Sequence, residues 1–549
     1  MEIQLLEFCK KGILRLPSGR FSFLTAGISL SALSLLWIFS NYLRSGMSYY
    51  YDEIFDLVSI YGLPNMCQDV HAVTNLSVSI GCIPIQSGVP YVGAVRTFLL
   101  FPIVKLGLLT PSTLTMIMLT VYLIAFFQAK RLMDVLGVSR SVNISVIVLF
   151  ALTPSLWLNS AFDFGPISIQ FLLRTLLLIE VFRQLNNPER GFLRIFLYSA
   201  LLIWGKLDSL FFLFFPLLIV AINALKTQKI RKKSGFWMYA NIILYLVSFG
   251  YALRISQSSS ENLVSHAIHM ITTIIPTNLI YSVFNIIYPN QAPSTWLILG
   301  RVFFFLTILL TVLNLAISLK RFLQTSKPIE LFYILCSLTT LGVIASLSLV
   351  SNATAPWHTF SIFPSAIIVT ANMIDYFRKK FNAIKFAVAP MVILSLVLIL
   401  NMNITFLKVQ DSKISPLFSS TLVEEVDKRI EMYKIQKGDG IAFVNWGDYN
   451  RFLLTRKSAD VVIPDLWDAW PWFDNNDKIK TTEFLNWVTV DGPWGAYNKI
   501  LFVQSSLSAP GLKSSLIDSL EIEGWRVDKI DTFSDENFFV NFVILVKST

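Results

Sequence analysis

The 549-residue sequence is 54% hydrophobic and only 15% charged, and its mean hydropathy is +0.60, which excludes an ordinary soluble protein. Its apolar residues fall into stretches of about twenty, the length of a helix that crosses a bilayer. The net charge of +10 does not indicate nucleic acid as a partner, because the basic residues lie in short loops between the apolar stretches. We therefore expect a polytopic α-helical protein embedded in a lipid bilayer.

The apolar pattern begins near the N-terminus. Lys10, Lys11, Arg15 and Arg20 precede an apolar stretch that is too long for a signal peptide and lacks a convincing cleavage site, so the first helix should remain as an anchor. We expect about eleven transmembrane helices in all. Their predicted ranges are 21–43, 111–129, 142–160, 166–182, 193–205, 207–225, 236–253, 296–319, 330–350, 359–376 and 386–404.

The basic residues predict the orientation of these helices. Most Lys and Arg residues before position 405 lie in loops on the same side as the N-terminus, including the run from Lys226 to Lys233. The positive-inside rule makes this side cytoplasmic. An odd number of crossings then places the C-terminal region on the extracytoplasmic side.

A long loop on the outer side, residues 44–110, separates the first two predicted spans, and long ordered loops tend to carry function. It begins with Tyr51, Asp52 and Glu53. A carboxylate at the membrane surface can take a proton from a hydroxyl, although a solvated acidic helix N-terminus is the simpler interpretation of this pair taken alone. Cys67 and Cys82 share the loop, so an oxidising exterior could join them in a disulfide.

Further ionisable residues recur in outer turns. Lys206 interrupts two apolar helices, where a charge is costly unless it is paired or functional, and Asp208 or Asp163 could pair with it. Asp163 and His358 each occupy another outer turn, and Arg96 maps to the same side. Each residue alone is explained by a salt bridge or a helix cap. Together they would form a pocket suited to the phosphate of a lipid carrier.

Two arginines lie within apolar spans, where a guanidinium usually pairs with an acid or lines a polar cavity. Arg301, near the outer end of its span, is a further candidate for the phosphate pocket, whereas we expect Arg174 to be structural. The sequence has no Cys-x-x-Cys, His-Glu-x-x-His or Walker-type motif. Neither a zinc site nor ATP-driven transport is therefore indicated.

The chain changes character after the transmembrane domain, residues 1–404. Residues 405–549 are richer in acidic residues, and their apolar stretches shorten to the length of strands. We expect a small extracytoplasmic α/β domain here. Strands are predicted at 441–445, 499–504, 525–531 and 538–546, and helices near 420–435 and 511–522.

Over residues 20–405 the sequence resembles the GT-C superfamily of integral-membrane glycosyltransferases. The similarity is to the branch that contains protein O-mannosyltransferases and the lipid A aminoarabinose transferase. The matching pieces, in order, are Tyr51-Asp52-Glu53, Pro90 to Arg96 with Phe101-Pro102 and Gly107, Asp163-Phe164-Gly165-Pro166, Gly205-Lys206, and His358 with Phe363-Pro364.

The resemblance implies an inverting transfer of a sugar from a polyprenyl-phosphate donor to an acceptor hydroxyl at the outer face of a bacterial plasma membrane. Asp52 would be the general base, assisted by Glu53. Arg96, Lys206 and His358, with Arg301, would bind the leaving phosphate, while Asp163 and Tyr51 would position the acceptor or the sugar. This chemistry requires no cofactor. Because the donor carries a single phosphate and several cationic side chains are available, we expect the reaction to be independent of metal, although a divalent metal is compatible with it. The resemblance leaves open whether the acceptor is a lipid, a glycan or a protein.

Other functions fit parts of the pattern. A ligase that transfers a whole lipid-linked glycan would use the same residue types as a monosaccharide transferase. A secondary transporter would also combine many helices with a few intramembrane charges, but it predicts internal repeats, and we find no convincing repeat between the two halves. A membrane-anchored sensor or scaffold that binds through its outer domain would need no Asp52.

Overall fold

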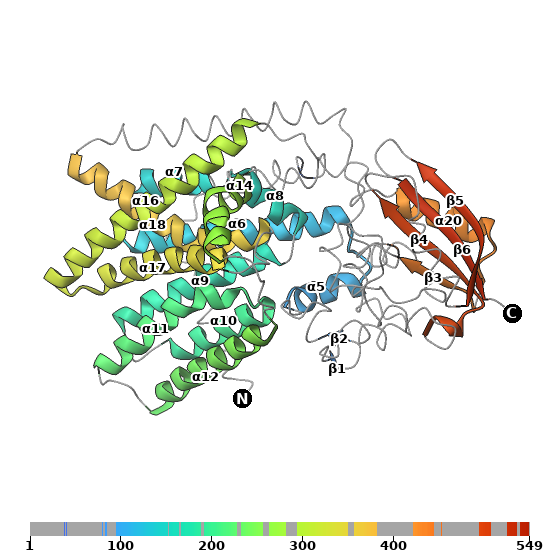
Figure 1. Cartoon of the computed structure of the whole chain (residues 1–549). Helices are drawn as coiled ribbons and strands as arrows, with labels where there is room; N and C mark the ends of the chain where they lie inside the picture. Colours follow the sequence, from blue (N-terminus) through green and yellow to red (C-terminus); the bar gives the residue numbers. More distant parts are fainter. Residues whose placement is uncertain are drawn as a thin grey trace.

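The computed structural model is mostly helical, with a bundle of long helices and a small sheet near the C-terminus (Figure 1). The structure describes residues 38, 40, 79–80, 83–84, 95–151, 153–163, 166–187, 191–227, 232–255, 263–280, 294–349, 356–381, 421–436, 438–443, 452, 493–506, 524–534 and 539–547. The predicted span 386–404, nearly all of 21–43 and most of the first outer loop lie outside these residues.

The first half of the bundle follows the apolar stretches of the sequence. Its helices are α5 (Val95–Lys105), α6 (Pro111–Val135), α7 (Arg140–Ala151), α8 (Pro154–Phe162), α9 (Ile167–Asn186), α10 (Phe192–Gly205), α11 (Ser209–Thr227) and α12 (Lys232–Ile255). Short segments follow: α13 (Leu263–His269), a π-helical turn (Met270–Ile274) and α14 (Ile275–Ile280). The second half contains α16 (Ser294–Thr325), α17 (Pro328–Leu349), a 3₁₀ helix (Pro356–Ile362) and α18 (Phe363–Phe381).

The prediction of a single helix over 142–160 is wrong, because the helix is interrupted between α7 and α8. Pro154 has no N–H to continue the hydrogen bonds of α7, and its ring disfavours helical geometry at the preceding residue. Thr153 is accordingly extended, with ψ 116°. Pro154 then occupies the first turn of α8, a position that suits proline.

Several helices are long and apolar enough to cross a membrane, which supports a membrane protein. Five such stretches occur among the described residues: Pro111–Val135, Gly235–Ala252, Ile298–Thr325, Pro328–Leu349 and His358–Phe381. Shorter apolar helices include Phe192–Gly205 and Ser209–Leu225. The number of about eleven crossings remains a prediction.

The helices share a continuous apolar core. α6 packs against α9, α9 against α10, and α17 against both α11 and α16. Gly342 allows α17 to approach α11 closely, because a Cβ at this position would overlap the ring of Phe215. Polar contacts reinforce the second half: the Asn314 amide lies 2.8 Å from Ser337 Oγ, and Asn372 donates to Asn314 Oδ1 at 2.7 Å. Such bonds between helices add specificity where lipid offers no other partner.

The C-terminal sheet has its own apolar core and the strand order β3-β4-β6-β5. Its strands, β3 (Gly440–Phe443), β4 (Lys499–Ser506), β5 (Trp525–Ser534) and β6 (Phe539–Lys547), confirm all four predicted strands. β3 pairs with β4 in parallel, and the other pairs are antiparallel. Helix α20 (Thr421–Met432) buries Leu422, Val426 and Ile430 in this core. The predicted boundary at residues 404/405 and the predicted helix 511–522 lie outside the described residues.

Candidate functional site

The turn between α10 and α11 presents two charged residues of opposite sign. α10 ends at Gly205, and Lys206 is extended, with φ −167° and ψ 129°. The Ser209 N–H donates to the carbonyl of Lys206 at 3.1 Å, which closes the turn. Asp208 stands directly before α11, where the helix macrodipole favours a negative charge. Local structure therefore fixes Lys206 and Asp208 at the ends of two apolar helices.

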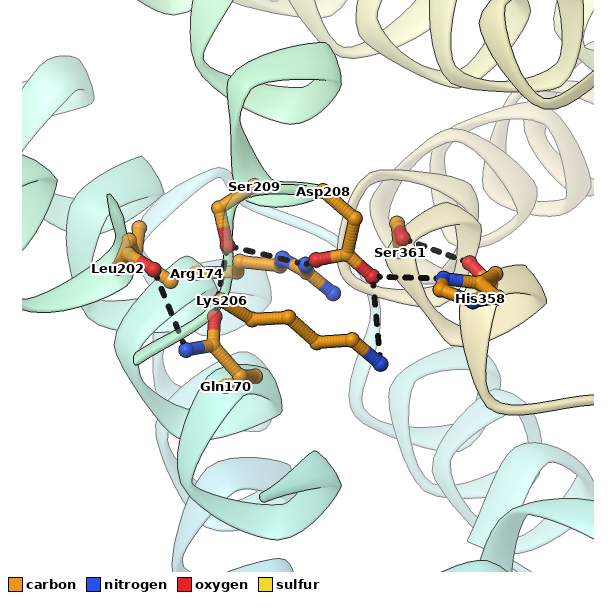
Figure 2. A network of polar contacts seen from close by, with 8 residues as sticks. All are labelled: Gln170, Arg174, Leu202, Lys206, Asp208, Ser209, His358 and Ser361. Atoms are coloured by element: carbon orange, nitrogen blue, oxygen red, sulfur yellow. Dashed lines mark hydrogen bonds and ion pairs between the residues drawn. The ribbon is translucent and has the colours of Figure 1, made fainter. Parts of the chain in front are cut away.

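Three charged or ionisable side chains converge on Asp208 (Figure 2). Its Oδ1 accepts a hydrogen bond from Arg174 Nη2 at 3.1 Å. Its Oδ2 lies 3.3 Å from Nδ1 of His358 and 3.6 Å from Nζ of Lys206. These residues come from α9, the turn after α10, and the 3₁₀ helix Pro356–Ile362. We call Arg174, Lys206, Asp208 and His358 the Asp208 network.

Neighbouring polar groups hold the Asp208 network in place (Figure 2). Arg174 Nη2 also donates to Ser209 Oγ at 3.2 Å, and its guanidinium lies 5.7 Å from the ring centroid of Phe212. Ser209 Oγ donates to Gln170 Oε1 at 2.8 Å, and Gln170 Nε2 donates to the Leu202 carbonyl at 3.3 Å. α9 is thereby tied to the end of α10 and to the start of α11.

A second buried ion pair joins Arg96 of α5 to Asp163, which follows α8. Arg96 Nη1 lies 2.7 Å from Asp163 Oδ2 and donates to the Asp163 carbonyl at 3.2 Å. Both side chains are almost completely buried. Asp163 has φ 44°, a left-handed conformation that Asp tolerates better than most residues. Arg96 therefore binds the side chain and the backbone of this tight turn together.

The two clusters are neighbours, because α5 packs against the end of α10. Gly205, just before Lys206, contacts the side chain of Val95, just before Arg96: a Cβ on Gly205 would lie 3.7 Å from Val95 Cγ2. The rings of Phe98 and Trp204 are also in contact, with centroids 5.1 Å apart. The residues that precede the two basic groups therefore lie side by side.

The Asp208 network is shielded from solvent: the side chains of Lys206 and Arg174 are 2% and 3% exposed, and those of Asp208 and His358 are 8% and 12% exposed. Removing charges from water costs several kcal/mol each, in order of magnitude, unless partners compensate. The carboxylate of Asp208 supplies that compensation to both cations. Two basic side chains and an imidazole set around one carboxylate suit an anionic ligand such as a phosphate.

The structure shows how some of the predicted site residues pair. It brings Lys206 together with His358, and it pairs Lys206 with Asp208, while Asp163 pairs with Arg96. Arg301 lies in α16 with its side chain exposed.

The remaining predicted residues cannot be placed in this way. Tyr51, Asp52, Glu53, Cys67 and Cys82 lie outside the described residues. Their predicted roles therefore stay predictions.

Two members of the Asp208 network had no functional role in the sequence analysis. Asp208 was considered only as a salt-bridge partner for Lys206, and Arg174 was expected to be structural. Arg174 itself was the signal in the sequence. Burying a guanidinium within an apolar helix is costly, so a carboxylate partner is expected nearby. Asp208 is an acid close to Lys206 in sequence, but only the packing of α9 against α11 makes it the partner of Arg174 as well.

No group of three His, Cys, Asp or Glu side chains that could hold a metal ion occurs among the described residues. Asp52 and Glu53 are not among them, so metal independence stays a prediction. Cys336, the free cysteine found in the described part of the chain, is buried in α17.

Comparisons with known proteins find similar chains among the solved structures only. The sequence matches no protein-family profile and no curated protein. Among solved structures, the chain is similar to the crystal structure of the oligosaccharyltransferase of Archaeoglobus fulgidus in complex with zinc and sulfate, with 12% sequence identity and a TM-score of 0.44. The match covers 86% of this chain and 67% of that chain. The proposed function rests on the contacts among the site residues and not on this likeness.

Proposed function

We propose that the protein is a GT-C-type membrane glycosyltransferase, which transfers a sugar from a polyprenyl-phosphate donor to an acceptor hydroxyl. The observation that carries the proposal is the convergence of Arg174, Lys206 and His358 on Asp208, a carboxylate at the start of an apolar helix. Charged groups at such positions are costly in lipid and usually mark a substrate site. A phosphate attached to a lipid chain would meet these groups beside the bilayer.

The chemistry follows from the leaving group. The acceptor oxygen forms a bond to the anomeric carbon, and the bond between that carbon and the phosphate oxygen breaks, so polyprenyl phosphate leaves with the electron pair. Lys206 and His358 would stabilise the charge that grows on the phosphate, as fixed donors do in oxyanion sites. Asp208 and Arg174 would act as positioning residues that hold Lys206 and His358 in place.

The acceptor must lose its proton in the same reaction. We propose Asp52 as the general base, with Glu53 assisting and Tyr51 positioning the sugar or the acceptor, because this acidic segment follows the first predicted span. Arg96 and Arg301 remain proposed phosphate ligands. The Arg96–Asp163 pair would also fix the turn after α8 beside the site. Attack from the face opposite the phosphate would invert the anomeric configuration.

The distribution of charge supports an outward-facing site. Arg131, Arg183 and Arg194 lie at the ends of α6, α9 and α10 that are opposite to Lys206. By the positive-inside rule those ends face the cytoplasm, and the Asp208 network would face the outside together with the C-terminal domain. We propose the plasma membrane as the location.

Transfer of a complete lipid-linked glycan would use the same chemistry as transfer of one sugar. In both reactions the leaving group is a lipid-bound phosphate or pyrophosphate, and the acceptor supplies a nucleophile. The size of the donor that is consumed distinguishes the two reactions.

The test is sugar transfer from a panel of radiolabelled polyprenyl-phosphate sugars into envelope fractions. Wild type is compared with Asp52→Asn at matched expression, and Lys327→Gln serves as a control because Lys327 is an exposed residue of the short connection between α16 and α17. We expect wild type and the control to transfer sugar and Asp52→Asn to be inactive. Normal transfer by Asp52→Asn would refute the assigned base, and no transfer from any donor by wild type would refute the glycosyltransferase proposal.

A further inference from the structure

A pocket of about 770 Å³ lies at the opposite ends of the helices that carry the Asp208 network. It is formed by the last turns of α6 and α9 and the first turn of α10. α9 runs from the Asp208 network, at Arg174, to this pocket, and α10 runs back from the pocket to Lys206. The pocket is therefore separate from the proposed transfer site, and the charge distribution predicts that it faces the cytoplasm.

The pocket is rich in positive charge. Arg131 of α6, Arg183 of α9 and Arg194 of α10 line it, and Glu180 is the one carboxylate among the described lining residues. Glu180 is 6% exposed and forms ion pairs with Arg183 and, at 3.3 Å, with Arg194. The buried carboxylate orients two guanidinium groups at the rim, where Arg183 is 47% exposed and Arg194 is 37% exposed. Guanidinium groups held in this way match the geometry of a phosphate.

The backbone also favours an anion here. Gly191, with φ 96°, caps the N-terminus of α10. Gly191, Leu193 and Arg194 line the pocket, so the first turn of α10 borders it with its positive dipole end. Asn187 adds an exposed amide to the same rim.

Apolar side chains complete the lining and indicate what kind of phosphate would bind. Val135, Phe182 and Leu193 lie beside the arginines, and Val135 is 64% exposed. A soluble phosphate would gain nothing from these side chains. A phospholipid would place its phosphate against the arginines and its glycerol and acyl chains against the apolar wall. Basic pockets between membrane helices on the cytoplasmic side are known to suit anionic head groups.

We propose that this pocket binds the phosphate head group of an anionic phospholipid from the cytoplasmic leaflet. The bound lipid joins α6, α9 and α10 at the ends remote from the Asp208 network. Because it contacts the folded protein and not the unfolded chain, it stabilises the helical bundle in proportion to its occupancy.

The test measures binding to the delipidated full-length protein in detergent. Short-chain phosphatidylglycerol, short-chain phosphatidylcholine and inorganic phosphate are titrated separately, and the ligand-dependent rise in Tm gives the affinity. We expect phosphatidylglycerol to bind and phosphatidylcholine and inorganic phosphate to have little effect. A rise with inorganic phosphate equal to that with phosphatidylglycerol would overturn the lipid assignment in favour of a soluble phosphate.

The variants locate the site. Arg131→Gln combined with Arg194→Gln leaves Arg183 to neutralise Glu180, and each lost charge should weaken phosphatidylglycerol binding by about fivefold. Asn187→Asp adds a negative charge at an exposed position and removes no buried group, so it should also weaken phosphatidylglycerol binding. Lys327→Gln is the matched control. The proposal fails if both pocket variants bind phosphatidylglycerol like wild type, or if Lys327→Gln weakens binding as much as they do.

Discussion

The Nδ1 atom of His358 lies 3.3 Å from Oδ2 of Asp208, although these residues are 150 positions apart in the chain (Figure 2). Asp208 precedes α11, and His358 lies in the 3₁₀ helix before α18. The other oxygen of the same carboxylate accepts from Arg174 in α9. One carboxylate therefore contacts side chains from three separate segments. Some substitutions in the Asp208 network should mainly lower the stability of the protein, and others should mainly lower the rate of sugar transfer.

Asp208→Asn should destabilise the protein. The amide keeps the shape of the carboxylate, but it cannot neutralise Arg174 and Lys206, both of which are buried. Breaking a buried charge pair costs about 3 kcal/mol or more, and thermal unfolding in detergent would measure the loss. The Tm of Asp208→Glu, which keeps the charge, should lie between those of Asp208→Asn and wild type. Equal Tm values for wild type and Asp208→Asn would show that the carboxylate does not compensate these cations.

Lys206→Met should separate transfer from folding. Methionine keeps much of the apolar bulk and removes the charge, while Arg174 and His358 still contact Asp208. If Lys206 stabilises the leaving phosphate, kcat should fall by about a hundredfold with little change in Tm. Lys206→Arg should restore part of the activity, and Lys327→Gln should leave it unchanged. Transfer by Lys206→Met at the wild-type rate would remove this residue from the proposed mechanism.

The Arg96–Asp163 pair should behave as a coupled structural unit. Arg96→Met and Asp163→Asn each leave one buried charge without its partner, so each should lower the free energy of unfolding by about 3 kcal/mol. Asn also tolerates the left-handed backbone at position 163. The double variant should be more stable than the sum of the single losses predicts. A double-mutant cycle of Tm values tests this, and strict additivity would argue against direct coupling.

Gly205→Ala should disturb the Asp208 network without removing any of its polar groups. A Cβ at this position would overlap the amide of Gln170, which holds Ser209 and the Leu202 carbonyl. Displacing Gln170 shifts the turn that carries Lys206, so both Tm and transfer should fall. Gly250→Ala is the matched control, because a Cβ there meets no atom within 4 Å. Comparable losses of Tm and transfer in the two variants would show that the contact with Gln170 is not responsible.

The sequence by itself determined the class of protein and the positions of most helices. Apolar stretches of bilayer length force a helical backbone to satisfy its own hydrogen bonds, so composition and periodicity were sufficient for α6, α9, α10 and α17. The four C-terminal strands were equally visible in short apolar stretches. The break before Pro154 was also encoded locally, by a residue that cannot continue a helix, but the apolar pattern across it concealed the break.

Only the tertiary structure decided which charges meet. The sequence predicted that Lys206, Asp163, His358 and Arg96 lie on the outer side. It offered two acids as partners for Lys206 and no reason to choose between them. The tertiary structure pairs Asp163 with Arg96. Packing of α9 against α11, and of the 3₁₀ helix against both, brings Arg174 and His358 to Asp208 beside Lys206. The physical reason is that an ion pair depends on a few ångströms of separation in space. Hydropathy and residue spacing along the chain do not contain that distance.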